Sequence, residues 1–284
     1  MSSFFLLILV LLGYAGEVHA DILFLDLNNG EKEIEAARAA ADKRWTVGDD
    51  GKMHREKLIV FPDVPTSVRR RFREINSQLD ALAAGIDKTG FFTAEIQDKM
   101  SRLNQEEESL KGKYFVTSAL LGTKLKELAK KHVKLTSLVI SGHSSGDEFY
   151  GQFADKTFGR DDILNALESA PEIRNSIHSI FLWGCYGGTE SNSLYWKNSD
   201  SKLNLVVGFS ATAPLSTQSP SYYLLGDALI RAEELAGKND LRSVRKMLLS
   251  LNSVNQTPAT LLVGKCFVGT EVPSTYEDGK EANC

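Results

Sequence analysis

The chain has 284 residues, of which 42% are hydrophobic and 25% are charged, and its formal net charge at pH 7 is −4. These values are typical of a globular protein that is long enough to build one sizeable core. A slightly acidic balance does not favour nucleic acid or an anionic membrane surface as a partner, so neither is expected.

The first twenty residues are expected to be a secretory signal peptide. Phe4 to Leu12 is a continuous apolar run, and Val18-His-Ala20 is a small-residue cleavage pattern, although Met1 to Ser3 carries no Lys or Arg. The run is well short of the ~20 residues that span a bilayer. We therefore expect an exported protein, periplasmic or secreted, with no membrane contact once the signal is removed. Its mature domain would cover residues 21–284.

The three cysteines are expected to play two different roles. Cys266 and Cys284 lie near the C-terminus with polar, turn-forming residues between them. In an oxidising compartment they are expected to form a disulfide, which leaves Cys185 unpaired. An unpaired thiol in an exported protein is either a small buried side chain or a group that is used.

The beginning of the mature chain has the pattern of a β-α-β unit. Ile22 to Leu27 is an apolar run that ends in Asn-Asn-Gly and predicts a strand. Glu31 to Arg44 is rich in Ala with apolar residues at helical spacing, and Lys57 to Phe61 predicts a second strand. Units of this kind build parallel sheets, so an α/β fold is expected.

Residues 65–113 change in character and interrupt this alternation. The segment is rich in Arg, Glu, Gln and Lys, and its apolar residues recur at helical steps. This pattern predicts two amphipathic helices packed as an antiparallel hairpin, inserted into the α/β domain. Such an insertion serves either as a solvated structural element or as a docking arm. The spaced apolar residues are Ile75, Leu79, Leu82, Ile86, Ile96, Met100, Leu103 and Leu110.

The α/β alternation resumes after the insertion. Residues 147–158, in which aromatics alternate with small and polar residues, predict a short β-hairpin between two of the later elements. The predicted helices are Thr117–His132, Asp161–Leu167, Tyr222–Ala236 and Leu241–Leu251, and the predicted strands are Ser137–Ser141, Ser179–Trp183, Leu203–Phe209 and Thr260–Val263.

Two of the predicted strands end at turns of small residues that carry reactive side chains. One continues as Ser-Gly-His143-Ser-Ser-Gly and the next as Gly-Cys185-Tyr-Gly-Gly. The carboxyl ends of parallel strands share one edge of a sheet, where ligands bind. A neutral imidazole there can take the proton of a thiol, and the resulting thiolate is a strong nucleophile. The sequence thus predicts a cysteine hydrolase, specifically a peptidase, with Cys185 as nucleophile and His143 as general base and acid.

Acyl transfer also requires donors for the developing oxyanion, and backbone N–H groups in tight turns supply them. The candidates are the N–H of Cys185 and the N–H of Ser144, which follows the histidine. Gly184, Gly187 and Gly188 would let the backbone approach a substrate. No phosphate-binding glycine loop and no cluster with metal-ligand spacing occurs, so neither a cofactor nor a metal is expected.

A second nucleophile competes with Cys185. Gly142-His-Ser-Ser-Gly146 matches the G-x-S-x-G nucleophile elbow of serine hydrolases, with Ser144 as the nucleophile. That fold requires a catalytic histidine late in the chain, yet none follows His178. It also requires a helix directly after the elbow, where this sequence predicts a hairpin. A serine hydrolase therefore remains an alternative function.

The order of these elements resembles the caspase/legumain/gingipain group of cysteine peptidases (clan CD). A strand ending in Ser-Gly-His, a short hairpin, a helix and a strand ending in Gly-Cys follow one another, with 42 residues from His143 to Cys185. The resemblance covers residues 22–209, interrupted by the insertion, and is specific around Leu138–Leu167 and Ser179–Gly188. It implies a three-layer α/β/α sandwich with a mostly parallel six-stranded, caspase-like sheet, and cleavage of peptide bonds in a peptide or protein substrate.

The resemblance also assigns roles by position. His143 and Cys185 take the catalytic places, whereas Ser144 stands where the group usually has Gly. That departure leaves a catalytically inactive binding or regulatory module as a further alternative. The loop after the strand that follows the cysteine helps line the substrate pocket in this group, which implies substrate contacts for Ser210 and Tyr222, with Gly184 beside them. The sequence defines neither the cleavage specificity nor the oligomeric state.

Overall fold

The structure is a computed structural model, and it describes residues 20–47, 51–154, 158–199, 203, 205–209, 213, 225–230, 259–263 and 266–269. Most of the predicted signal peptide, the side chains of the predicted Cys266–Cys284 disulfide, and Ser210 and Tyr222 lie outside the described residues. Of the two helices predicted between residues 222 and 251, only 225–230 is described, and it is helical.

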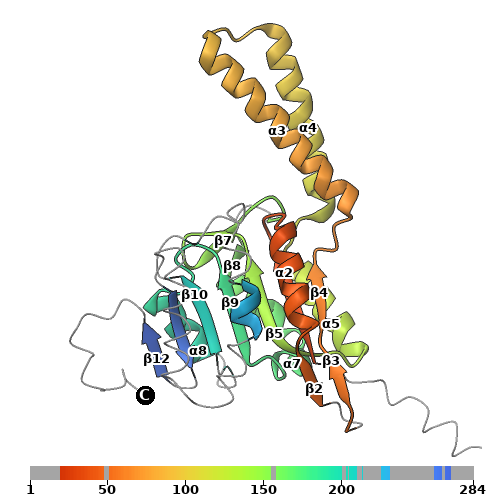
Figure 1. The fold of residues 1–284 in the computed structure, drawn as a ribbon, viewed down its shortest axis with the longest axis vertical. Coiled ribbons are helices and arrows are strands. Elements are labelled where there is room, and N and C mark those ends of the chain that lie inside the picture. Colours follow the sequence, from red (N-terminus) through yellow and green to blue (C-terminus); the bar gives the residue numbers. More distant parts are fainter. Residues whose placement is uncertain are drawn as a thin grey trace, which may run out of the picture.

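A single twisted sheet runs through the domain (Figure 1). Five neighbouring strands are parallel, and two antiparallel strands extend the sheet at one edge. The α/β class and the largely parallel sheet are therefore confirmed, but the described strands number seven rather than the six that the resemblance implies. In spatial order they are β12 (Cys266–Gly269), β11 (Ala259–Val263), β10 (Leu205–Phe209), β9 (Ser179–Trp183), β5 (Lys134–Ser141), β1 (Ala20–Asp26) and β4 (Lys57–Phe61).

Helices cover both faces of this sheet. Alternate residues of the five parallel strands enter two separate apolar clusters, one on each face. In β9, for example, Leu182 packs into one cluster and Phe181 into the other. One face is covered by α5 (Ser118–Lys130), α6 (Arg160–Glu168), α7 (Pro171–Arg174) and α8 (Glu190–Ser199), and the opposite face by α2 (Glu31–Ala41) and residues 225–230. This arrangement is compatible with a three-layer α/β/α sandwich.

The strand order creates a topological switch point beside β1. The connection through α2 carries the chain from β1 to β4 on one side, whereas β5, β9 and β10 follow on the other side. In open parallel sheets, ligands bind at the carboxyl ends of the strands near such a point. The carboxyl-end rim of β1, β5 and β9 is therefore the place where a site is expected.

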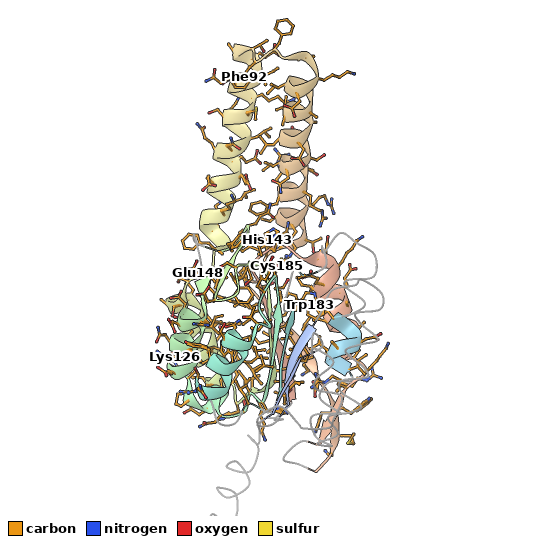
Figure 2. All side chains as sticks on the ribbon, turned by 90° about the vertical axis from the view of Figure 1, so that its left-hand side faces the viewer. Phe92, Lys126, His143, Glu148, Trp183 and Cys185 are labelled. Atoms are coloured by element: carbon orange, nitrogen blue, oxygen red, sulfur yellow. The ribbon has the colours of Figure 1, made fainter. Side chains whose placement is uncertain are left out.

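The predicted insertion is a long helical hairpin that projects from this rim (Figures 1 and 2). It consists of α3 (Thr66–Thr89) and α4 (Ala94–Tyr114), which confirms the prediction for residues 65–113. At its tip, Gly90 adopts a φ of 70° and Thr93 caps α4 by accepting a hydrogen bond from the Ile96 N–H. Phe91 and Phe92 lie on the loop between the helices and are 72% and 57% exposed.

Buried contacts attach the base of this arm to the domain. The Arg69 guanidinium on α3 bonds the Asp26 carboxylate at the end of β1 at 2.5 Å, and both side chains are buried. Phe72 and Phe153 pack edge to face beside this ion pair, with their ring centroids 5.4 Å apart. A second ion pair joins Arg73 to Glu31 at the start of α2. The arm is therefore fixed to the rim at its base.

Two small sheets complete the domain. β6 (His143–Ser144), β7 (Glu148–Tyr150) and β8 (Phe158–Gly159) form a three-stranded sheet, which confirms the predicted hairpin after His143. β2 (Trp45–Val47) and β3 (Met53–Arg55) form an antiparallel pair, which is not among the strands predicted from the sequence, within the connection that leads to β4. Among the described helices, none combines the length and the apolar character needed to cross a membrane.

Candidate active site

The register of the sheet brings the two predicted catalytic turns to the same place. Ser141, the last residue of β5, pairs with Trp183, the last residue of β9. Beyond this pair, the Gly142 N–H donates to the Trp183 carbonyl at 3.3 Å. His143 and Cys185 each follow the pair by two residues, and Figure 2 shows both at the rim, at the base of the helical arm.

His143 is an exposed residue on the outer side of the small sheet. It pairs with Tyr150 across the β6–β7 ladder, and the two rings stack with centroids 5.5 Å apart and an angle of 23° between their planes. Tyr150 is itself 44% exposed. The stacking partner therefore restricts the imidazole while leaving it accessible to a substrate and to solvent.

The backbone directs the Ser144 N–H toward the cysteine turn. Successive N–H groups of an extended strand point to opposite sides. The Gly142 N–H bonds Trp183 on β9, whereas the Ser145 N–H bonds the Glu148 carbonyl at 3.1 Å on the side of β7. The N–H of Ser144, two residues after Gly142, therefore faces the side on which the Cys185 turn lies. This orientation agrees with its predicted role as an oxyanion donor.

Cys185 is an unpaired, partly exposed thiol at the start of a tight turn. The next residue, Tyr186, adopts a φ of 58°, in the left-handed region that a non-glycine residue enters only at a cost of roughly 1–3 kcal/mol. The turn is then attached to β10 by a hydrogen bond of 2.9 Å from the Gly188 N–H to the Phe209 carbonyl. This bond helps hold the backbone around the thiol in an uncommon conformation.

The glycines of the cysteine turn are required by close packing inside the protein. A Cβ on Gly184 would lie 2.6 Å from the Gly142 carbonyl oxygen and 2.8 Å from Cβ of Ser144. A Cβ on Gly187 would lie 2.9 Å from Cβ of Leu182. Their small size thus allows the two strand ends to meet, and direct contact of Gly184 with a substrate stays a prediction.

Ser144 does not occupy a nucleophile elbow. Its side chain is only 3% exposed, and its Oγ accepts a hydrogen bond of 2.9 Å from the Gly146 N–H. The chain after it turns into the β6–β7 hairpin, where an elbow requires the start of a helix. The hydroxyl is therefore used in shaping the turn that follows His143.

A buried asparagine that no sequence pattern singles out links the two turns. Asn192 lies on α8, is 1% exposed, and uses its amide nitrogen to donate to the carbonyls of Gly146 at 2.8 Å and Gly187 at 2.7 Å. The first carbonyl belongs to the histidine turn and the second to the cysteine turn. An isolated Asn in a helix gives no sequence signal for such a role, because the two turns become neighbours only in the folded sheet.

A buried acid lies beneath the rim, next to the strand that leads to His143. Glu33 on α2 accepts a hydrogen bond from the Ser141 hydroxyl and is 5% exposed. Burial raises the pKa of Glu33 to about 7, the Asp26 carboxylate contributes in the same direction, and the Ser141 hydrogen bond opposes them. Between pH 4.5 and about 7 the folded protein therefore keeps a proton on the Glu33 carboxyl group. An unfolded chain has already released this proton, because the ordinary pKa of the group is 4.5.

This proton is expected to make the stability fall as the pH rises. Between about pH 4.5 and 7 the native state binds one proton more than the unfolded chain, so the free energy of unfolding decreases by about 3 kcal/mol and then levels off. Glu33→Gln should remove this part of the slope and leave the variant more stable than the wild type at alkaline pH. Urea unfolding at a series of pH values measures both effects. If the free energies of unfolding of the two proteins changed with pH in the same way, the raised pKa of Glu33 would be contradicted.

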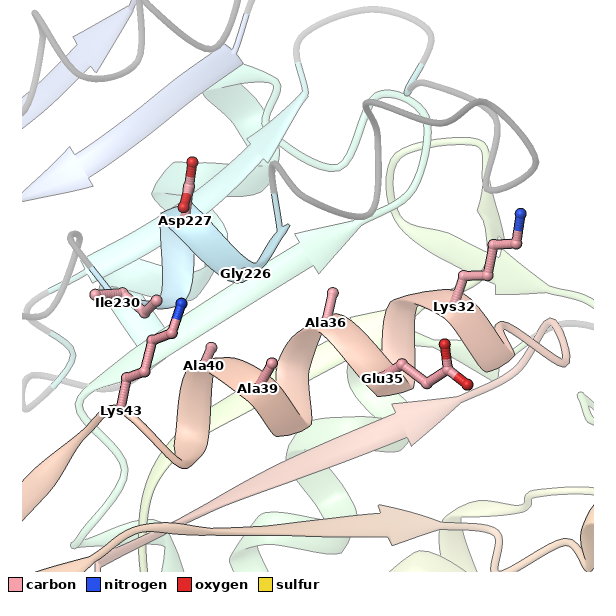
Figure 3. Close-up of a pocket in the computed structure, with 9 residues that line it drawn as sticks. All are labelled: Lys32, Glu35, Ala36, Ala39, Ala40, Lys43, Gly226, Asp227 and Ile230. Atoms are coloured by element: carbon pink, nitrogen blue, oxygen red, sulfur yellow. The ribbon is translucent and has the colours of Figure 1, made fainter.

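The described residues contain no group of three His, Cys, Asp or Glu side chains arranged to hold a metal ion. A groove of about 350 Å³ lies between α2 and residues 225–230 (Figure 3). Its floor includes Ala36, Ala39 and Ala40, with Lys32 toward one end and Lys43 toward the other. His143 and Cys185 do not line it, so it is separate from the candidate site.

The comparisons with known proteins identify no relative. No family model matches the chain, and no curated protein and no solved structure matches it.

Proposed function

We propose that this protein is an exported cysteine endopeptidase with a caspase-like domain, in which Cys185 attacks the peptide carbonyl and His143 transfers the proton. The observation that carries the proposal is the pairing of Ser141 with Trp183, which delivers a histidine turn and a cysteine turn side by side at the carboxyl ends of neighbouring parallel strands. A ligand-binding position, an unpaired thiol and an accessible imidazole thus occur together.

The reaction follows from the groups at the rim. His143 accepts the proton of the Cys185 thiol, and the thiolate adds to the scissile carbonyl. The N–H groups of Ser144 and Cys185 then donate to the oxyanion, and His143 returns the proton to the leaving amine. Water hydrolyses the resulting thioester by the same route. These steps need only the protein's own side chains and backbone, together with the substrate and water.

The experiment that tests this proposal is cleavage of a diverse peptide library by the mature protein, together with the alkylation rate of Cys185. We expect cleavage, and we expect Cys185 to react faster than a simple thiol at neutral pH. A protein that cleaves nothing and whose Cys185 reacts like a free thiol would be an inactive binding module. That second candidate is favoured specifically by Ser144, whose side chain stands where the resemblance implies Gly.

Replacing Ser144 distinguishes the serine hydrolase from the cysteine peptidase. Ser144→Ala removes the hydroxyl but keeps the backbone N–H, so a cysteine peptidase should retain activity within a few-fold of the wild type. A serine hydrolase would lose its activity entirely, because its nucleophile would be gone. Steady-state kinetics on the best library substrate decide between them. Ser145→Ala, a change of the neighbouring serine, is the matched control.

A further inference from the structure

We propose that Asn192 is a positioning residue that sets the geometry between His143 and Cys185, an inference that rests on the proposed function. The strand ladder connects the two catalytic strands only as far as Ser141, Trp183 and the Gly142 N–H. Beyond this point the chain makes two turns, and Asn192 provides a hydrogen bond to each of them. One rigid side chain thus fixes both turns relative to α8 and to each other.

The surroundings of Asn192 define the orientation of its amide. Arg160, on α6, donates from Nη1 to Oδ1 of Asn192 at 3.2 Å, and its guanidinium lies 4.0 Å from the ring centroid of Tyr195. The oxygen therefore faces a cation and the nitrogen faces two carbonyls. A flipped amide would place donor against donor and acceptor against acceptors, so only one orientation satisfies all three groups.

Arg160 is itself held from several sides. Its backbone N–H donates to the Asp147 carbonyl at 3.0 Å, in the hairpin that follows the histidine turn. The Tyr195 hydroxyl beneath its guanidinium donates to Asp161. Burial raises the pKa of Tyr195 to about 12, and the hydrogen bond to the Asp161 carboxylate is the second cause. The hydroxyl therefore keeps its proton and remains a donor. Asn192 is therefore the end of a network that connects α6, α8 and both turns.

Two backbone features indicate that the turns need this support. Tyr186 has a φ of 58°, a conformation that a non-glycine residue keeps only where its surroundings impose it. Gly146 has a φ of 112°, which glycine adopts without strain but also leaves easily, because it has the widest choice of backbone conformations. The two turns also touch, because a Cβ on Gly146 would lie 3.4 Å from the Tyr186 carbonyl oxygen. Asn192 bonds the carbonyl of Gly146 itself and that of Gly187, the residue after Tyr186. Without these bonds, the Tyr186 turn can relax and the Gly146 turn is free to change its conformation.

The test is Asn192→Asp, with Asn198→Asp as the matched control. The aspartate still accepts from Arg160, but it cannot donate to either carbonyl and places charge against both. Asn198 lies exposed on the same helix, so its variant makes the same chemical change away from the turns. The primary readout is the alkylation rate of Cys185, identified by peptide mapping, as a function of pH. The second is kcat and KM on a peptide substrate.

Asn192→Asp is expected to slow alkylation toward the rate of a simple thiol and to move its pH profile to the alkaline side. We expect kcat to fall about 100-fold with little change in KM, as a misplacement of about 1 Å produces. Asn198→Asp should behave like the wild type. A role in folding alone would lower the melting temperature without changing the reactivity of the folded fraction.

The possible results separate this inference from the proposed function. Suppose that Cys185 is activated in the wild type and that folded Asn192→Asp has the same pH profile of alkylation. This result overturns the role of Asn192 and leaves the proposed function standing. A wild-type Cys185 that reacts like a simple thiol overturns the proposed function, and the inference with it. If Asn192→Asp does not fold, Asn192→Ser keeps one small donor and should show the same shift at a smaller size; an unchanged profile there overturns the inference.

Discussion

Cys185→Ala and His143→Ala are each expected to abolish peptide cleavage, with a loss in kcat of at least about 1,000-fold. The first removes the nucleophile, and the second removes the group that accepts the thiol proton and later protonates the leaving amine. Both side chains are at least partly exposed and neither belongs to an apolar cluster, so the melting temperatures should stay close to that of the wild type.

Two controls separate a catalytic histidine from a structural one. His132 is an exposed imidazole at the end of α5 with a φ of 55°, so His132→Asn removes a ring without straining the backbone and should leave activity unchanged. Added imidazole should restore part of the activity of His143→Ala, because a small base can enter an accessible site. Full activity in Cys185→Ala would assign the chemistry to another nucleophile.

Arg69→Met is expected to lower the free energy of unfolding by about 3–5 kcal/mol. The substitution leaves the Asp26 carboxylate fully buried without its cation. Within the described part of the chain it keeps the bonds that it accepts from the backbone N–H groups of Asn28 and Gly30. It also removes the bonds from Arg69 to the Val64 carbonyl and to Asn29. Urea unfolding measures the loss.

Arg71→Met is the matched control for this prediction. Arg71 lies two residues further along α3 and pairs with Glu106 on α4, but both side chains are about two-fifths exposed. An exposed pair contributes little, so this variant should lose far less stability than Arg69→Met. The double variant Arg69→Met, Asp26→Asn should recover part of the loss, since the unpaired charge is then gone. Equal losses for Arg69→Met and Arg71→Met would contradict the anchoring role of the buried pair.

Strong periodic patterns made much of the fold predictable. The apolar run from Lys57 to Phe61 and the run from Ser179 to Trp183 have the bounds in the structure that the sequence predicts. The helical spacing of the insertion likewise predicts α3 and α4 to within a residue or two at their outer ends. In these segments burial and local propensity favour the same structure, so a single sequence contains enough information.

Short elements and long-range contacts were not predictable in the same way. The β2–β3 pair consists of two strands of three residues each, too short for a period to be recognised. β12 begins three residues after the end of β11 and adds an antiparallel strand that the resemblance does not imply. The roles of three residues depend on contacts that the local sequence does not encode. Asn192 and Glu33 bond residues far away in the sequence, and Tyr150 stacks on His143 at the surface. Their importance at the rim follows from the folded register and from no local pattern.

The attachment of the helical arm has a mechanical consequence. α3 has 24 residues and is therefore about 36 Å long, and its first turns are fixed to the rim through Arg69 and Phe72. A rigid rod of that length converts a rotation of about 5° at its base into a displacement of about 3 Å at its far end. Phe91 and Phe92 thus sit where motion is magnified most. A pair of labels, one beside Phe91 and one on the sheet, would therefore report small rotations at the base of α3.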